Sequence, residues 1–155
     1  MISSKYFDLK FPDFLSLKFL GGNGDPWNSN PNSYDPQEWK SGSNRQLATF
    51  GAGCYWGTEK YFAQDFAQRY PPGAIIGTSV GFMSADPNAI SNPSYRQVCS
   101  GNSGHVEVLQ ILYNPSFIPY SDMVRFFFTF HDPTTLDQQG NDHGPQYASV
   151  IFTHD

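Results

Sequence analysis

Charged residues and cysteines are both scarce in this chain of 155 residues. Asp, Glu, Lys and Arg together make up only 15% of it, and the formal net charge is −5 at pH 7. A nucleic-acid-binding surface needs a basic patch, so this balance argues against a nucleic-acid partner. The two cysteines, Cys54 and Cys99, are too few for the disulfide framework of a small secreted protein. They suit a reducing compartment in which at least one thiol is kept for chemistry.

Long apolar runs and targeting signals are also missing. The sequence has no stretch of 18 apolar residues, so nothing in it predicts a membrane-spanning helix. Residues 1–20 contain acidic residues and no arginine, which fits poorly with an organelle transit peptide, and they lack a secretory cleavage site. We therefore expect a cytoplasmic protein. Apolar content is 39% and aromatic content 17%, enough for one domain with a core built largely from rings.

A change in composition divides the chain at about residue 44. Residues 21–44 are rich in Gly, Pro, Asn, Ser and Asp, which is typical of a linker. The pattern predicts an N-terminal extension with linker over residues 1–44 and a compact domain over residues 45–155. Apolar periodicity and turn residues in that domain predict four strands, two helices and a short helix or turn. The strands are Gln46–Phe50, Ala74–Phe82, His105–Tyr113 and Tyr147–Thr153; the helices are Tyr55–Gln68 and Asp122–Phe130; the short segment is Pro93–Ser100.

The two long helices separate the strands in the order β-α-β-β-α-β. This order predicts an α+β fold of the ferredoxin-like, split βαβ type, a two-layer sandwich of an antiparallel sheet with helices on one face. Ser121 is the expected N-cap of the second helix. Residues 131–146 are expected to form a long polar loop.

Cys54 follows a glycine-rich turn and precedes the first predicted helix, within Gly53-Cys54-Tyr55-Trp56-Gly57. A thiol at the positive end of a helix loses its proton more easily, and the thiolate is the reactive form. The glycines allow another molecule to approach the sulfur, and Tyr55 and Trp56 offer an apolar wall. An equally simple interpretation is a buried cysteine that packs as a small apolar residue in a tight turn.

Two further places carry polar groups suited to chemistry. Glu107 shares a strand face with apolar residues, so it lies either at a solvated edge or partly buried, where a raised pKa would make it a proton donor. The segment 138–147 is long for a simple connector, and Asp142 and Tyr147 in it can order water or donate a hydrogen bond. A zinc site is not expected, because these residues lack a recognised ligand spacing: His131, Asp132, Asp142 and His143.

Taken together, four segments resemble the peptide methionine sulfoxide reductase family, A type. They occur in family order with nearly family spacing, and the resemblance covers roughly residues 47–155. The matching segments are Gly53–Gly57, Tyr95–Gly101 with Gly104–Glu107, His131–Thr134, and Gln139–Tyr147. The resemblance implies an enzyme that reduces the S epimer of methionine sulfoxide, free or in proteins, to methionine through a sulfenic acid at Cys54. It implies neither a cofactor nor a metal.

The resemblance also implies a role for each matching position. Cys54 would attack the sulfoxide sulfur, and Glu107 would protonate its oxygen. Tyr95 and Tyr147 would donate hydrogen bonds to that oxygen, and Asp142 would order water and substrate. The expected substrate-binding residues are Gly53, Tyr55, Trp56 and His143. Thioredoxin or another thiol would act as reductant, oxidised proteins would be substrates of a protein-repair enzyme in oxidative stress, and the chain would act as a monomer.

Several positions depart from the family pattern. The family usually has Phe where Tyr55 stands, Tyr where Phe82 stands, and a small polar residue where Pro145 stands. The family continues beyond the point where this chain ends, at Asp155, in a segment that commonly carries resolving cysteines, so the domain is expected to be truncated. Cys99 matches a cysteine that is not the resolver in the family.

Two other functions remain open from the residues alone. A cysteine hydrolase would pair Cys54 with His105 or His143 and would need an oxyanion hole. An inactive relative would instead act as a peptide-binding module that recognises methionine sulfoxide without reducing it.

Overall fold

The computed structural model describes residues 18–19 and 44–154, and the other residues, including most of the predicted extension 1–44, lie outside the described part. The main sheet has five strands in the order β1-β3-β4-β2-β7, and each neighbouring pair is antiparallel. These strands are β1 (Lys18–Phe19), β2 (Gln46–Ala52), β3 (Ile75–Ser84), β4 (His105–Tyr113) and β7 (Ser149–Phe152). The predicted α+β class with an antiparallel sheet is confirmed.

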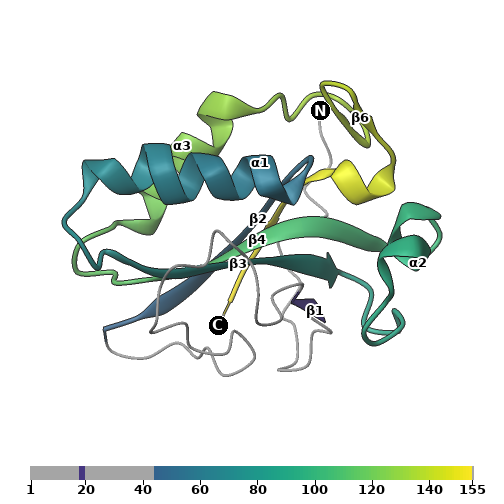
Figure 1. The fold of residues 1–155 in the computed structure, drawn as a ribbon, viewed down its shortest axis with the longest axis horizontal. Helices are drawn as coiled ribbons and strands as arrows, with labels where there is room; N and C mark the ends of the chain where they lie inside the picture. Colours follow the sequence, from purple (N-terminus) through teal and green to yellow (C-terminus); the bar gives the residue numbers. More distant parts are fainter. Residues whose placement is uncertain (1–17, 20–43, 155) are drawn as a thin grey trace, which may run out of the picture.

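Two helical segments lie on one face of this sheet (Figure 1). The first is continuous from α1 (Tyr55–Lys60) through a π-helical stretch, η2 (Tyr61–Phe66), to a short 3₁₀ helix, η3 (Ala67–Arg69). It matches the helix predicted over Tyr55–Gln68, although its middle is π-helical. The second is α3 (Tyr120–Phe130).

The start of α3 differs from the expectation. Ser121 was expected to cap the helix, but the N-cap is Pro119, and no side chain caps the first turn. Proline fixes its own φ near the value required at a helix entry, so the backbone enters the helix without a hydroxyl cap. The Ser121 prediction is therefore wrong, and α3 begins one residue before it.

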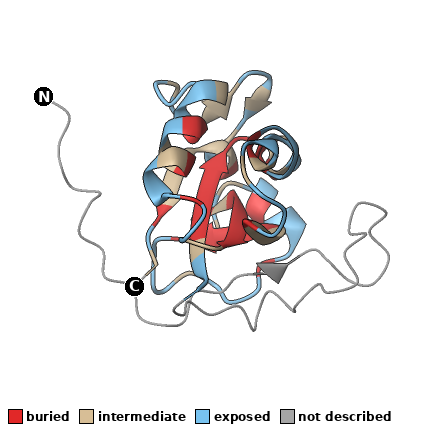
Figure 2. Cartoon of the chain, turned by 90° about the vertical axis from the view of Figure 1, so that its left-hand side faces the viewer, coloured by how far each residue is buried: buried red, intermediate tan, exposed pale blue. Residues whose placement is uncertain are grey.

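Aromatic rings fill the space between the helices and the sheet. Phe50 of β2 is fully buried; its ring centroid lies 5.0 Å from that of Phe62 and 5.1 Å from that of Phe127 on α3. Offset and tilted ring pairs at these spacings add to the free energy gained by burying the rings themselves. Figure 2 shows the buried residues gathered in the central strands and on the helices that cover them. Strand β4 lies between β3 and β2, and all of its residues except Val106 are buried.

The segment expected to be a polar loop contains regular structure. It holds a two-stranded hairpin, β5 (Gln138–Gln139) with β6 (Asp142–His143), and a 3₁₀ helix, η4 (Pro145–Tyr147). Strand β7 starts at Ser149, so Tyr147 lies in η4 rather than at the start of a strand. A further short helix, α2 (Tyr95–Cys99), precedes β4. Within the described residues, no helix has the length and apolar character needed to cross a bilayer.

Candidate active site

Cys54 occupies the turn that joins β2 to α1. Gly53 has a φ of 81°, a conformation that residues with a Cβ rarely adopt, and it turns the chain so that Cys54 becomes the N-cap of α1. The Cys54 carbonyl accepts the backbone N–H groups of Gly57 at 3.1 Å and Thr58 at 3.2 Å. The side chain is neither buried nor fully exposed, and the cysteine is free. The thiol therefore lies at the start of a helix, as the sequence predicted, and its residue is not fully buried in the core.

Glu107 lies beneath this helix start, in the centre of the sheet. It is the third residue of β4, and only 2% of its surface is exposed. The backbone N–H of Tyr55 donates to its Oε2 over 3.0 Å, which ties the carboxylate to the residue after Cys54. Burial raises the pKa of Glu107 to about 7; the Tyr55 N–H opposes that rise and the Asp142 carboxylate adds to it. The sequence left open whether Glu107 lies at a solvated edge or is buried, and in the structure it is buried.

The hairpin β5–β6 packs against the turn that holds Cys54. A Cβ placed on Gly53 would lie 2.6 Å from the Cβ of Gln139 and 3.9 Å from Oδ2 of Asp142. Glycine is thus required both by the φ of residue 53 and by the close approach of the hairpin. This contact brings Asp142 to the same end of the sheet as Cys54 and Glu107.

Two tyrosines approach from other elements. Tyr95 begins α2, whose N-terminus is fixed by a capping box between Ser94 and Gln97. A hydrogen bond from its hydroxyl to Cys99 is the largest of the influences that raise the pKa of Tyr95 to about 12, although its side chain is 53% exposed. Burial, followed by the Glu107 and Asp142 carboxylates, raises the pKa of Tyr147 in η4. The five residues expected to act on the sulfoxide therefore come together from five elements.

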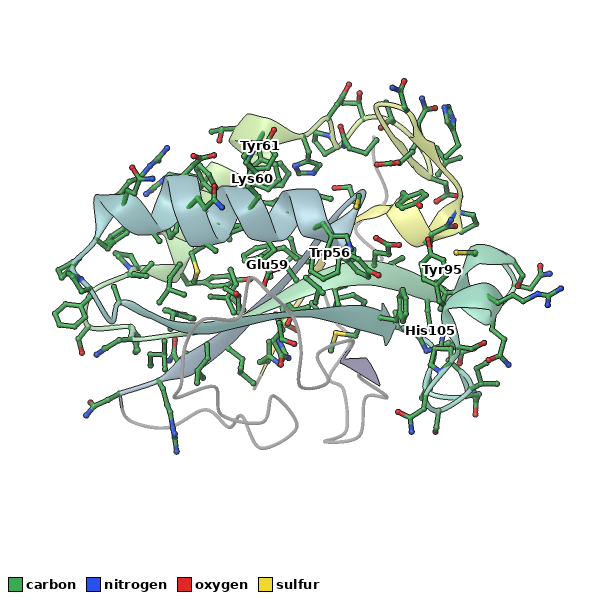
Figure 3. The ribbon with its side chains drawn as sticks, viewed as in Figure 1. Trp56, Glu59, Lys60, Tyr61, Tyr95 and His105 are labelled. Carbon is green, nitrogen blue, oxygen red and sulfur yellow. The ribbon has the colours of Figure 1, made fainter. Side chains whose placement is uncertain are left out.

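Two aromatic residues follow Cys54 directly, and a third ring packs on the first of them. Tyr55 is 5% exposed, and its ring lies 5.3 Å from Trp56 in an edge-to-face pair and 5.8 Å from Phe82. Trp56 is 45% exposed, and Figure 3 shows Trp56 and Tyr95 at the same end of the sheet. Burial, and then the Glu107 carboxylate, raises the pKa of Tyr55 well above its ordinary value. His143, expected to bind substrate, is exposed on β6.

His105 does not complete a hydrolase site with the thiol. His105 is 2% exposed; its Nδ1 lies 2.9 Å from the Ser103 carbonyl, and its Nε2 has no hydrogen-bond partner. The Cys–His hydrogen bond that a cysteine hydrolase requires is therefore not formed with His105. Among the residues that the structure describes, no three His, Cys, Asp or Glu side chains gather where a metal ion could bind.

The sequence did not predict that Gln139 contacts Gly53 or that Phe82 packs on Tyr55. Gln139 stands in a polar stretch with no periodic pattern, so nothing in the local sequence indicates its contact with Gly53. Phe82 belongs to a β-rich run in which any apolar residue would fit the strand. Their contacts depend on how distant segments pack.

A half-buried thiol at a helix start and a buried carboxyl with a raised pKa thus lie at one end of an α+β domain. The family model described as "Peptide methionine sulfoxide reductase" matches residues 46–155. The chain therefore belongs to the peptide methionine sulfoxide reductase family.

Individual relatives agree with this assignment. A peptide methionine sulfoxide reductase MsrA of Methanothermobacter thermautotrophicus is 43% identical over 72% of this chain and 60% of its own length. One from Nostoc sp., MsrA 1, is 46% identical over 76% of this chain and 68% of its own. This chain thus spans about 60–68% of the length of these two relatives.

Solved structures of related proteins share the fold. The reduced form of Mxr1 from Saccharomyces cerevisiae superposes with a TM-score of 0.63 at 36% identity, covering 79% of this chain and 63% of that one. Methionine sulfoxide reductase A of Corynebacterium diphtheriae gives a TM-score of 0.61 at 36% identity, over 74% of this chain and 49% of that one.

Proposed function

We propose that this protein reduces the S epimer of methionine sulfoxide, free or in proteins, to methionine, as a peptide-methionine (S)-S-oxide reductase. The observation that carries the proposal is the hydrogen bond from the Tyr55 N–H to buried Glu107, which places a protonatable carboxyl beside the helix start that holds Cys54. Family membership supports the same reaction.

The reaction begins with attack of the Cys54 thiolate on the sulfoxide sulfur. A sulfoxide is a weak electrophile until its oxygen is protonated, and Glu107 supplies that proton. The S–O bond of the substrate breaks, its oxygen passes to Cys54 as a sulfenic acid, and the thioether of methionine is released. Two electrons move from the cysteine sulfur to the substrate sulfur, so the substrate is reduced and Cys54 oxidised.

The surrounding residues stabilise the charge that develops on the sulfoxide oxygen. Tyr95 and Tyr147 donate hydrogen bonds to it; phenols are protonated near neutral pH, and the pKa values of both are raised further. Asp142 orders water and substrate. Gly53, Tyr55, Trp56 and His143 form the substrate-binding set, in which the rings of Tyr55 and Trp56 contact the S-methyl group.

Return of Cys54 to the thiol requires a second thiol. We propose thioredoxin or another thiol reductant as the electron donor, oxidised proteins as substrates, and a monomer in the cytoplasm as the working form. Both described cysteines are free thiols, which is compatible with a reducing compartment. For the architecture, the antiparallel strand order supports a ferredoxin-like split βαβ domain over residues 45–155, preceded by an extension over residues 1–44.

Methionine formation from resolved sulfoxide epimers, with dithiothreitol as reductant, tests the proposed activity. We expect turnover of the S epimer only, loss of turnover in Cys54→Ser, and an intact chemical step in Cys99→Ser. Methionine production by Cys54→Ser at the wild-type rate would refute the mechanism. Binding of the sulfoxide without any turnover would instead identify a peptide-binding module.

A further inference from the structure

The side chain of Gln139 joins two loops that flank the thiol. Its Oε1 accepts the backbone N–H of Asp132 at 3.1 Å, and its Nε2 donates to the Asp132 carbonyl at 3.2 Å. One amide group therefore holds both backbone polar groups of a single residue just beyond α3. Asp132 is itself fixed, because its Oδ1 accepts the backbone N–H of Thr134 at 2.9 Å and the Thr134 hydroxyl at 2.6 Å.

The aliphatic part of Gln139 packs on the backbone that leads to Cys54. A Cβ on Gly53 would lie 2.6 Å from Cβ and 3.0 Å from Cγ of Gln139. Real Cβ atoms do not approach so closely, so Gly53 and Gln139 are in direct contact with no space between them. The position of Gln139 thus limits where the turn that carries Cys54 can lie.

Gln139 is also the partner of Asp142 across the β5–β6 hairpin. The same Gly53 position that meets Gln139 lies 3.9 Å from Oδ2 of Asp142. Strands of two residues do not form a stable hairpin alone, so contacts outside the hairpin must fix the place of Asp142. The Gln139 amide provides one such contact from within the hairpin.

We propose that Gln139 is a positioning residue, which holds Asp142 beside Glu107 and Cys54 through its paired hydrogen bonds to Asp132. It is not among the residues that the reaction itself requires, since it acts through Asp142. The proposal rests on the proposed function for its effect on turnover, but its effect on Glu107 can be measured without turnover.

Displacement of Asp142 should change the protonation of Glu107. The Asp142 carboxylate raises the pKa of Glu107, so moving it away lowers that pKa, and opening the hairpin to water acts in the same direction. The other titratable groups near Glu107 come from elements outside the hairpin: Cys54 and Tyr55 at the start of α1, Tyr95 on α2, His105 on β4 and Tyr147 on η4.

Gln139→Met removes both hydrogen bonds and keeps the Cβ and Cγ atoms that pack on Gly53. Gln138→Met is the matched control, because the Gln138 amide donates to the Gly140 carbonyl within the same turn, whereas the Asp132 backbone is bonded by Gln139. Gln139→Asn is the second variant, since it keeps a neutral amide but is one methylene shorter, so the amide no longer reaches both Asp132 backbone groups. Thermal unfolding of each variant shows whether the domain still folds.

The primary measurement is a pH titration of Glu107 by NMR with carbon-13 in the glutamate carboxyls. The chain has three glutamates, so the Glu107 signal is identified as the one lost in Glu107→Gln. We expect a lower Glu107 pKa in both Gln139→Met and Gln139→Asn, and the wild-type value in Gln138→Met. A second measurement follows dithiothreitol-driven methionine release, in which misplacement by about 1 Å lowers kcat by up to roughly 10²-fold while KM changes less.

An unchanged Glu107 pKa in a folded Gln139→Met protein would overturn the proposal, as would an equal decrease in Gln138→Met. If the wild type reduces no sulfoxide and Gln139→Met still lowers the Glu107 pKa, the proposed function fails and the positioning role stands. If Gln139→Met does not fold, Gln139→Asn decides by the same titration.

Discussion

Replacement of Glu107 with Gln tests the proposed proton donor, because the change keeps the shape of the side chain and removes its acidic proton. Burial raises the pKa of Glu107 from an ordinary value of 4.5 to about 7. At pH 7 about half of such a carboxyl is protonated, whereas only about 0.3% is protonated at the ordinary pKa. The structure thus increases the population of the acid by roughly a hundredfold.

Methionine release in a single turnover, without added reductant, measures this contribution directly. General acid catalysis is worth about 10²–10⁴-fold, so we expect Glu107→Gln to release methionine more slowly by a factor in that range. Loss of the Glu107 proton should lower the wild-type rate, relative to that of the variant, tenfold for each pH unit above about 7. The variant should lack this decline, since glutamine does not titrate.

Glu59→Gln is the matched control, because the Glu59 carboxylate accepts a hydrogen bond from Thr78 at 2.8 Å on β3. It should leave the rate and its pH dependence unchanged. A decrease of less than a few-fold in Glu107→Gln, or the same alkaline decline in that variant, would show that another group protonates the oxygen.

The remaining predictions concern stability, the turn and the thiols. Because the folded-state pKa of Glu107 lies above its unfolded value, wild-type stability should fall by up to about 3 kcal/mol as the pH rises from about 4.5 through 7, and Glu107→Gln should not show this fall in urea unfolding. Gly53→Ala should lower the free energy of unfolding by about 2 kcal/mol or more, because residue 53 has a φ of 81° and a Cβ there would meet Gln139. An unfolding midpoint at the wild-type urea concentration would contradict this. After one turnover without reductant, dimedone should label Cys54 in the wild type and in Cys99→Ser; a rapid Cys54–Cys99 disulfide, seen by mass spectrometry, would refute this.

Elements bounded by strong local signals could be predicted well from the sequence. Strand β4 was predicted with both ends correct, because an apolar run lies between Gly104 and the Asn114-Pro115 pair. The helix start at Cys54 was predicted for a similar reason, since glycines precede it and helix-forming residues follow. These signals act over a few residues and do not depend on distant parts of the chain.

The hairpin that carries Asp142 could not be predicted, because two-residue strands are too short to show an alternating pattern. The start of β7 was misplaced for a related reason: Tyr147 resembles a strand residue, but Gly144 and Pro145 direct the chain into η4 first. The burial of Glu107 was left open, because alternation along one strand does not reveal what covers its face. That information comes from α1, whose first backbone N–H bonds the carboxylate.

The contrast between His105 and Glu107 explains why this arrangement suits reduction better than hydrolysis. Both residues lie on β4 two positions apart, and each is 2% exposed. Burial disfavours the charged form of both, so it lowers the pKa of His105 and raises that of Glu107. A neutral histidine whose Nδ1–H donates to the Ser103 carbonyl can only accept a proton, at Nε2, whereas a neutral glutamic acid can donate one. Because sulfoxide reduction consumes a proton at oxygen, the group that burial makes a donor is the one that faces the start of α1.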